Sequence, residues 1–551
     1  MKGFRFFIGI ALALGLFLRV SGIDKKIYQH DEVMTSMRVA GLHSEEVRAH
    51  IAMRQEIGMH DLQVYQQISA ERGVYATLHA LAVDDPKHPP LYYVLARLWA
   101  YVFGDSTFAF RSLSVLLSLL ALVGFYWLCQ ELFQSSSVTW MAVALAAISP
   151  FHILYAQEAR QYSLWTLTVI LSSAALLRAL RRQTWRAWGV YATTVAMGLY
   201  AHTLFVLVSF AHGVYALAYP LLTSQQGATG KSFFSLPKST GAYVAATLAA
   251  FLAFAPWAII IMVQLPVLHE NTRWIMKEVD FLYVVKHGVL GFSSLFFDPN
   301  GGVIFAARAN TEKPLTYWMR LPILLLITLS FFFLYHKTPR RVWLFVFILV
   351  GGTIAPLLLA DAITGWRSST PFRYLIPSYL GVQLSVAYLL TSGMASSKVF
   401  WRTSWRLAAV LLATGMVASC VRNAQAAVWW NKEASYALPH ISRVINRKVQ
   451  PLLLSTLNRK NLGNVIALSY LLDEKVRFRT ISDSHFLMNL DGFTDVFILH
   501  PSDHVRQLFK TQGYRLHSEI RSGELWRLSK EPSEAFNDEN EPEIDHERDH
   551  S

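Results

Sequence analysis

Apolar residues in this chain fall into long continuous runs separated by short polar segments. A helix that crosses the hydrocarbon core of a membrane needs about 20 mainly apolar residues. Runs of roughly this length predict about eleven helices, near residues 4–23, 111–133, 138–153, 161–180, 187–201, 203–222, 241–264, 315–335, 342–360, 373–393 and 405–421. The fold class is therefore an α-helical polytopic membrane protein, with residues 1–422 as its transmembrane domain.

Two of the connections between these runs are too long to be simple loops. Residues 24–110 include Val74, Leu78 and Leu81 at helical spacing, which favours helices lying at the membrane interface. Residues 265–314 contain Pro299 and Gly301-Gly302, which break regular structure. We expect helices in the first connection, whereas the second is predicted to be a long loop on the outer side.

After the last run, residues 423–530 have the alternation typical of a small soluble α/β domain. Strand-like segments at Pro451–Ser455, Val476–Ile481 and Asp495–Leu499 alternate with helix-like segments at Leu462–Leu472 and His504–Thr511. The acidic, polar residues 531–551 are predicted to be a disordered tail.

Charge decides the orientation of the spans. Of 551 residues 53% are hydrophobic and 16% charged, against about a quarter charged in soluble domains. With the N-terminus inside, nearly every short inner loop carries Lys or Arg: Arg178, Arg181, Arg182 and Arg186; Lys231 and Lys238; Lys337, Arg340 and Arg341; Lys398, Arg402 and Arg406. This bias explains the net charge of +13 by membrane topology rather than by nucleic acid binding. We expect a cell inner (plasma) membrane protein with a cytoplasmic N-terminus and an extracytoplasmic C-terminal domain.

The cysteines and the N-terminal apolar run further restrict the class of protein. The two cysteines, Cys129 and Cys420, both lie in apolar runs, which excludes a disulfide scaffold and a thiolate-rich metal site. The N-terminal run is predicted to be an uncleaved span rather than a signal peptide, with Arg19 snorkelling outward.

Unusual polar residues gather at the predicted outer boundary. Asp31 and Glu32 follow His30 shortly after the first span, between Tyr28 and the apolar pair Val33-Met34. A solvated loop start would explain them, but a partly buried carboxylate could deprotonate a hydroxyl acceptor or hold a divalent cation.

Two further clusters lie on the same side. Glu158, Arg160 and Tyr162 join the third and fourth spans, and could either form a helix start or bind a phosphate. Arg373 and Tyr374 begin the tenth span, where an arginine could snorkel or hold a phosphate with its planar fork. His202 is also outer-facing, and a lone histidine is more often an interface residue than a ligand. Each of these signals is weak by itself. The stronger observation is that all of these residues fall on the same, outer side of the membrane.

These residues fall within segments that resemble the GT-C superfamily of membrane glycosyltransferases. The resemblance is to the family 39 group of protein O-mannosyltransferases and bacterial aminoarabinose transferases, over roughly residues 1–390. It rests on His30-Asp31-Glu32, on Lys87-His88-Pro89-Pro90-Leu91-Tyr92-Tyr93, on Phe103-Gly104-Asp105-Ser106 with Phe110-Arg111-Ser112-Leu113, on Glu158-Ala159-Arg160-Gln161-Tyr162, on Gly198 to His202, and on Arg373-Tyr374-Leu375-Ile376-Pro377.

The resemblance implies transfer of a sugar from a polyprenyl-phosphate donor on the extracytoplasmic face, usually with inversion at the anomeric carbon. It gives Asp31 the role of general base, with Glu32 supporting it, and Glu158 that of a second acid, where relatives often have Asp. Arg160, Tyr162 and Arg373 would hold the lipid phosphate, with His88, His202 and Tyr374 as further substrate-binding residues. The acceptor could be a lipid, a glycan or a protein, because residues 423–530 carry no recognisable motif.

A metal and two other functions remain as alternatives. A divalent metal is optional: His30, Asp31, Glu158 and His202 could supply ligands, but their spacing is no metal signature. A lipid-linked-substrate transporter would place ionisable residues near the middle of the membrane, whereas here they cluster at its boundary. A surface-polysaccharide polymerase or ligase would use a different lipid-linked substrate.

Overall fold

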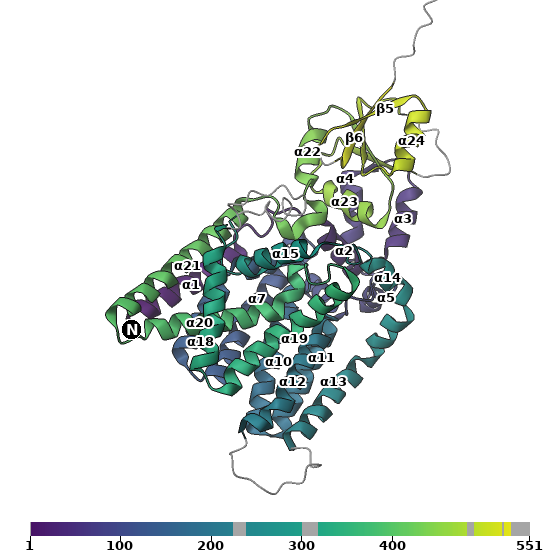
Figure 1. The fold of residues 1–551 in the computed structure, drawn as a ribbon. Coiled ribbons are helices and arrows are strands. Elements are labelled where there is room, and N and C mark those ends of the chain that lie inside the picture. Colours follow the sequence, from purple (N-terminus) through teal and green to yellow (C-terminus); the bar gives the residue numbers. More distant parts are fainter. Residues whose placement is uncertain (1, 224–237, 300–317, 482–489, 521–522, 531–551) are drawn as a thin grey trace, which may run out of the picture.

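The computed structural model describes residues 2–223, 238–299, 318–481, 490–520 and 523–530. A bundle of long apolar helices carries a compact group of short helices and a small sheet at one end (Figure 1). The long helices are α1 (Lys2–Val20), α7 (Thr107–Phe133), α8 (Ser136–Ala147), α9 (Pro150–Ala156), α10 (Tyr162–Arg182), α11 (Trp185–Ala201), α12 (Phe205–Thr223), α13 (Lys238–Val263), α18 (Leu321–Lys337), α19 (Arg340–Thr364), α20 (Ile376–Met394) and α21 (Val399–Gln425).

The helices match the predicted membrane spans. Within the described residues, eight helices are long and apolar enough to cross a membrane, and there are nine when α8 and α9, bent by 57°, are counted as one span. The remaining two predicted spans correspond to α11 and α18, each of 17 residues, the lower limit for a crossing. The chain is therefore a multi-pass membrane protein, as its hydropathy predicts.

The long first connection folds into helices at one end of the bundle. It contains α2 (His30–Val39), α3 (Ser44–Ala52), α4 (Met59–Gln63), the 3₁₀ helix η1 (Val64–Gln66), α5 (Val74–Asp84) and α6 (Leu91–Phe103). In the later connection the structure has α14 (Leu265–Thr272), α15 (Phe281–Ser294) and, before α20, the 3₁₀ helix η2 (Phe372–Leu375). Gly301-Gly302, Lys231 and the tail from residue 531 lie outside the described residues.

The C-terminal segment contains the predicted strands and helices, and several that sequence did not predict. It comprises η3 (Trp430–Ser435), α22 (Leu438–Asn446), β2 (Pro451–Ser455), α23 (Arg459–Ser469), β3 (Arg477–Thr480), β4 (Asp495–Leu499), α24 (Asp503–Thr511), β5 (Tyr514–Ser518) and β6 (Leu525–Lys530). The sheet has the order β1-β3-β2-β4-β6-β5, with β2 parallel to both β3 and β4.

The edge strand of this sheet comes from the first connection. Strand β1 (Ile57–Gly58) pairs antiparallel with β3, and places Ile57 opposite Phe478. Gln63 also donates to the Ser469 carbonyl at 3.0 Å. The C-terminal domain is therefore held against the first connection and is not suspended from α21 alone.

One expectation for the first span is wrong. Arg19 does not snorkel outward but is fully buried between helices. Its guanidinium donates to Ser118 Oγ at 2.9 Å, and to the carbonyls of Ala146 and Ala147 at the C-terminus of α8. Unpaired carbonyls at a helix end carry partial negative charge, so this end attracts the arginine more strongly than the membrane surface does. Cys129 and Cys420 are buried free thiols, as predicted.

The contact between α2 and α23 depends on a glycine. An added Cβ at Gly463 would overlap the ring of His30, next to Asp31. We predict that Gly463→Ala destabilises the folded protein by about 1–3 kcal/mol, the usual cost of overpacking. Gly288→Ala in α15, where the new methyl group would meet no atom within 4 Å, is the control. Thermal unfolding of the two detergent-solubilised variants measures the difference, and equal stability would contradict this packing.

Candidate active site

A cavity of about 1520 Å³ lies where the bundle, the first connection and the C-terminal domain meet. Six of the residues singled out from the sequence line it: Asp31, His88, Arg160, Tyr162, Arg373 and Tyr374. His30, proposed as a metal ligand, lines it too. Nine Lys or Arg side chains line the cavity against six Asp or Glu, so its surface favours an anionic ligand.

The carboxylate of Asp31 faces this cavity without a direct partner. Within the described part of the chain it has no hydrogen bond or ion pair, and only its backbone carbonyl is bonded, by Thr35 Oγ1 at 2.8 Å and by Arg160 Nη1 at 3.2 Å. Burial disfavours the charged form, but the positive charges of Arg160 and Arg373 outweigh it and hold the pKa of Asp31 well below its usual range. Asp31 is therefore an ionised acceptor open to a ligand.

The carboxylate of the neighbouring Glu32, unlike that of Asp31, is fully engaged by direct partners. It is fully buried, and Arg111 donates to both of its oxygens, at 2.8 and 2.9 Å. Lys432 Nζ at 2.7 Å and the backbone N–H of Ala159 at 2.9 Å complete its partners. Burial alone would raise the pKa of Glu32, but the charges of Arg111 and Lys432 lower it. With both oxygens engaged, Glu32 is a positioning residue.

The third predicted acid, Glu158, does not line the cavity. It is buried, and its Oε1 accepts hydrogen bonds from the amides of Gln29 and Asn431, both at 2.8 Å. Lys432 Nζ is 3.9 Å away. Burial, reinforced by the negative charges of Glu32 and Asp31, raises the pKa of Glu158 to about 7. Because it is enclosed by amides and lacks access to the cavity, the geometry favours a structural role.

Arg160 is held beside Asp31 by two side chains. Its Nη1 donates to Thr35 Oγ1 at 2.8 Å, and its Nη2 lies 3.4 Å from His88 Nε2. The other ring nitrogen of His88 is 2.8 Å from the Gln161 amide. Burial lowers the pKa of His88 well below its ordinary value, so the ring is neutral and can accept from Arg160. Nε of Arg160 is enclosed by protein and has no hydrogen-bond partner.

Arg373 lies among aromatic rings in η2, directly before α20. Its guanidinium carbon lies 5.8 Å from the ring centre of Tyr162, 5.6 Å from that of Trp274 and 5.7 Å from that of Tyr374. Stacking on aromatic faces fixes an arginine while leaving its N–H groups in the plane available. Arg160 and Arg373 thus present two oriented cations on the wall that also carries Asp31.

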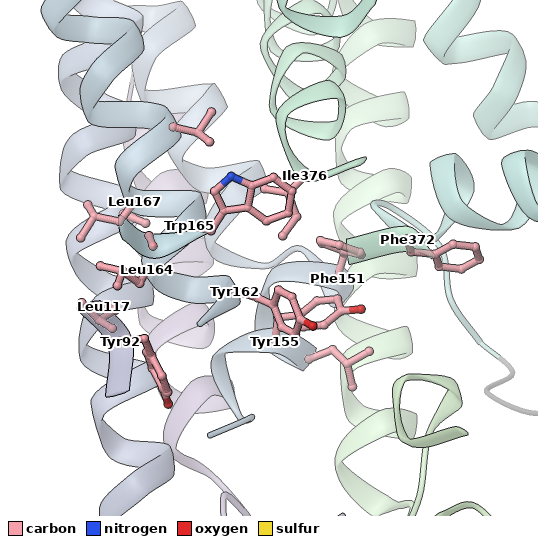
Figure 2. Packing of buried hydrophobic residues seen from close by; sticks show 14 of the residues in the cluster. Tyr92, Leu117, Phe151, Tyr155, Tyr162, Leu164, Trp165, Leu167, Phe372 and Ile376 are labelled. Atoms are coloured by element: carbon pink, nitrogen blue, oxygen red, sulfur yellow. The ribbon is translucent and has the colours of Figure 1, made fainter. Parts of the chain in front are cut away.

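The rings behind these arginines form a closely packed support. Figure 2 shows Phe151, Tyr155 and Tyr162 grouped beside Trp165 and Phe372. Tyr155 meets Tyr162 edge-on with ring centres 5.1 Å apart. His202 belongs to this support: it stacks on Trp165 at 4.1 Å and accepts from the N–H of Leu204, and it does not line the cavity.

The four candidate metal ligands do not converge. Among the described residues, no three His, Cys, Asp or Glu side chains are grouped as ligands. His202 is stacked on a tryptophan and Glu158 is bonded by two amides, so this donor set does not fit a metal ion.

Several site residues carried no clear signal in the sequence. Lys432 and Asn431 follow the last span in a segment without a motif, yet they contact Glu32 and Glu158. Arg111 lies within a matched segment, and its position just inside an apolar run could have identified it as a buried ion-pair partner. Asp85 pairs with its sequence neighbour Lys87 and also with Arg38 and Arg459, which come from distant parts of the chain.

Comparison with known proteins agrees with the resemblance seen in the sequence. Residues 87–260 match the family model described as dolichyl-phosphate-mannose-protein mannosyltransferase. This segment includes His88, Glu158, Arg160 and His202, and over it the match confirms the resemblance to membrane glycosyltransferases. No curated protein matches the chain in sequence.

Two solved structures are similar to the chain at low identity. One is ArnT from Cupriavidus metallidurans bound to undecaprenyl phosphate, with 12% identity, coverage of 95% of this chain and 97% of that chain, and a TM-score of 0.48. Another is the archaeal oligosaccharyltransferase AglB from Archaeoglobus fulgidus in complex with an inhibitory peptide and a dolichol-phosphate, with 12% identity, coverage of 85% and 64%, and a TM-score of 0.43.

Removal of the charge on Glu32 should destabilise the protein strongly. Glu32→Gln leaves Arg111 and Lys432 buried without their counter-charge, and breaking such a buried pair costs about 3–5 kcal/mol. The control is Glu45→Gln, whose exposed pair with Arg48 at 2.9 Å should contribute less than about 1 kcal/mol. Thermal unfolding in detergent compares the two, and a loss for Glu32→Gln no larger than the control's would contradict its structural role.

Glu158 should make the stability of the protein depend on pH. Its pKa is raised to about 7, so the folded protein retains a proton that the unfolded chain releases above about pH 4.5. Stability from this group therefore falls as pH rises from about 4.5 through 7, by about 1.4 kcal/mol for each pH unit in that interval. As the pH rises from 5 to 8, the Glu158→Gln variant should become increasingly more stable than the unsubstituted protein. A difference in melting temperature that is constant over this range would be the contrary result.

Proposed function

We propose that this chain is a membrane glycosyltransferase that moves a hexosyl or pentosyl group from a polyprenyl-phosphate donor to an acceptor hydroxyl. The observation that carries the proposal is the unpaired carboxylate of Asp31, which lines a cation-rich cavity beside Arg160 and Arg373. The family match over residues 87–260 supports the same class of reaction.

The two arginines suit the phosphate of the donor. Guanidinium groups bind phosphate oxygens through charge-assisted hydrogen bonds, and both arginines line the cavity. Positive charge fixed at this point stabilises the phosphate that leaves as its bond to the sugar breaks. Tyr162 and Tyr374, which line the same wall, hold the arginines and can contact the donor.

The proposed reaction is a single displacement. The acceptor oxygen forms a bond to the anomeric carbon while the bond from that carbon to the phosphate oxygen breaks. The electron pair of the broken bond leaves with the lipid phosphate, and the acceptor proton moves to the Asp31 carboxylate. Attack opposite to the leaving group inverts the anomeric carbon.

Binding of the donor should also strengthen the base. Asp31 owes its low pKa to Arg160 and Arg373, and an anionic phosphate bound to these arginines offsets their charge. The carboxylate then holds a proton more readily, nearer to what a general base requires at neutral pH. The arginines thus keep Asp31 ionised until the donor binds, and the bound donor makes it an effective base.

The basic inner loops support an orientation in the cell inner membrane with the N-terminus in the cytoplasm. The cavity and the C-terminal domain lie at the same end of the bundle, so both would face the extracytoplasmic side (Figure 1). The acceptor, whether lipid, glycan or protein, would enter from that side.

Asp31→Asn should abolish most of the transfer without loss of the fold. The contacts that its backbone carbonyl makes with Thr35 and Arg160 remain, whereas the proton acceptor is gone. We expect the rate to fall by about 10²–10⁴, measured as transfer from a panel of polyprenyl-phosphate sugars in proteoliposomes. Binding of polyprenyl phosphate should persist. Asp61→Asn, at an exposed position of the first connection, should retain full activity. Normal transfer by Asp31→Asn would refute the catalytic assignment.

A further inference from the structure

The C-terminal domain forms one wall of the cavity. Arg459 and Lys460 at the start of α23 line it, together with Arg443 of α22 and Glu519 and Glu524 near β6. Figure 1 shows α23 on the side of this domain that faces the helical bundle. Residues of this domain therefore share one continuous space with Asp31.

The topology of the sheet makes this wall a natural place for a ligand. Strand β2 lies between β3 and β4, parallel to both, so the chain leaves β2 toward β3 on one side and returns to β4 on the other. In such open sheets ligands bind outside the carboxyl ends of the strands, at the point where the strand order reverses. Helix α23 follows β2 directly, and its first residues are Arg459 and Lys460.

An excess of positive charge gathers beside α23. Asp85 is shared by three cations: Arg459 Nη2 at 3.1 Å, Arg38 Nη1 at 3.4 Å and Lys87 Nζ at 3.5 Å. Asp84, the other carboxylate near Arg38, accepts hydrogen bonds from Ser44 at 2.6 and 2.9 Å. Lys460 adds a further cation on the same wall.

Arg38 is the least satisfied member of this group. It is 1% exposed and lines the cavity, yet its Nε and Nη2 have no hydrogen-bond partner. Buried donors without partners are costly, and an anion in the cavity would offset the excess of positive charge that surrounds Arg38. The cluster is thus suited to a ligand that carries a negative group.

We propose that Arg38, Arg459 and Lys460 form an anion subsite for the acceptor, separate from the donor site at Arg160 and Arg373. This inference rests on the proposed function and specifies its acceptor. The acceptor hydroxyl meets Asp31 while a phosphate or carboxylate group of the same molecule binds the wall formed by α23. The acceptor class is therefore anionic, and a neutral glycan lacks the group that this wall recognises.

The test uses inorganic phosphate as the probe and full-length protein in detergent. Calorimetric titration measures phosphate binding to protein already saturated with a polyprenyl phosphate, so that the donor site is occupied. The test variant is Arg459→Gln combined with Lys460→Gln, which leaves Asp85 paired with Arg38 and Lys87. The matched control is Lys510→Gln, an exposed lysine of α24 in the same domain that does not line the cavity.

We expect phosphate to bind the saturated protein, to bind the double variant at least tenfold more weakly, and to bind Lys510→Gln unchanged. Arg373→Gln should weaken the binding of polyprenyl phosphate and leave the phosphate titration intact. No phosphate binding to the saturated protein, or equal binding by the double variant, would overturn the subsite.

Failure of the proposed function would look different. If the proposed function is wrong, polyprenyl phosphate does not bind the unsubstituted protein. The binding of inorganic phosphate by the unsubstituted protein and by the double variant can still be compared in the absence of the lipid. If the double variant does not fold, Lys460→Gln alone is compared with Lys510→Gln, because both are exposed lysines near a helix end. A weaker phosphate titration for Lys460→Gln alone supports the subsite, and identical titrations count against it.

Discussion

A carboxylate removed from water must meet positive charge and N–H donors, and Glu32 meets this requirement with groups from distant parts of the chain. Arg111 comes from α7, Lys432 from the segment after α21, and the N–H of Ala159 from the loop between α9 and α10. Each partner is itself buried or fixed, so none can move without leaving a charge unpaired. This one ion cluster joins the first connection, the membrane bundle and the C-terminal domain, and it fixes the walls of the cavity.

The same cluster explains how two adjacent acids acquire different tasks. Successive residues of an α-helix point about 100° apart, so Glu32 is directed into the protein interior when Asp31 faces the cavity. The interior residue is paired by two cations, whereas the cavity residue has positive charge nearby but no direct partner. Arg160 lies beside the cavity residue, because it bonds the Asp31 carbonyl and Thr35 Oγ1 and lines the same cavity. The C-terminal domain adds Arg459 to this surface through Asp85.

Much of the architecture could be predicted because membrane spans are long apolar runs. The parallel strands Pro451–Ser455 and Asp495–Leu499 were predicted with their observed bounds, since both are short apolar segments between turns. Strand β1 could not be predicted: two residues have no periodicity, and they form a strand only because β3 is beside them. Arg19 was misplaced for a related reason, since its partners are carbonyls of a distant helix end. Asp31, Arg160 and Arg373 were singled out as polar residues beside apolar runs and received roles from the resemblance, whereas Lys432 required the structure.

The most direct test of this account is a structure of the full-length protein with a polyprenyl phosphate bound. The account predicts that the phosphate lies in the cavity, within hydrogen-bond distance of both Arg160 and Arg373, with the lipid chain toward the membrane. The Asp31 carboxylate should remain free, across the space that a sugar on that phosphate would occupy. A phosphate held elsewhere, away from both arginines, or a salt bridge that engages Asp31 in the loaded protein, would contradict the assignment of this cavity as the site of transfer.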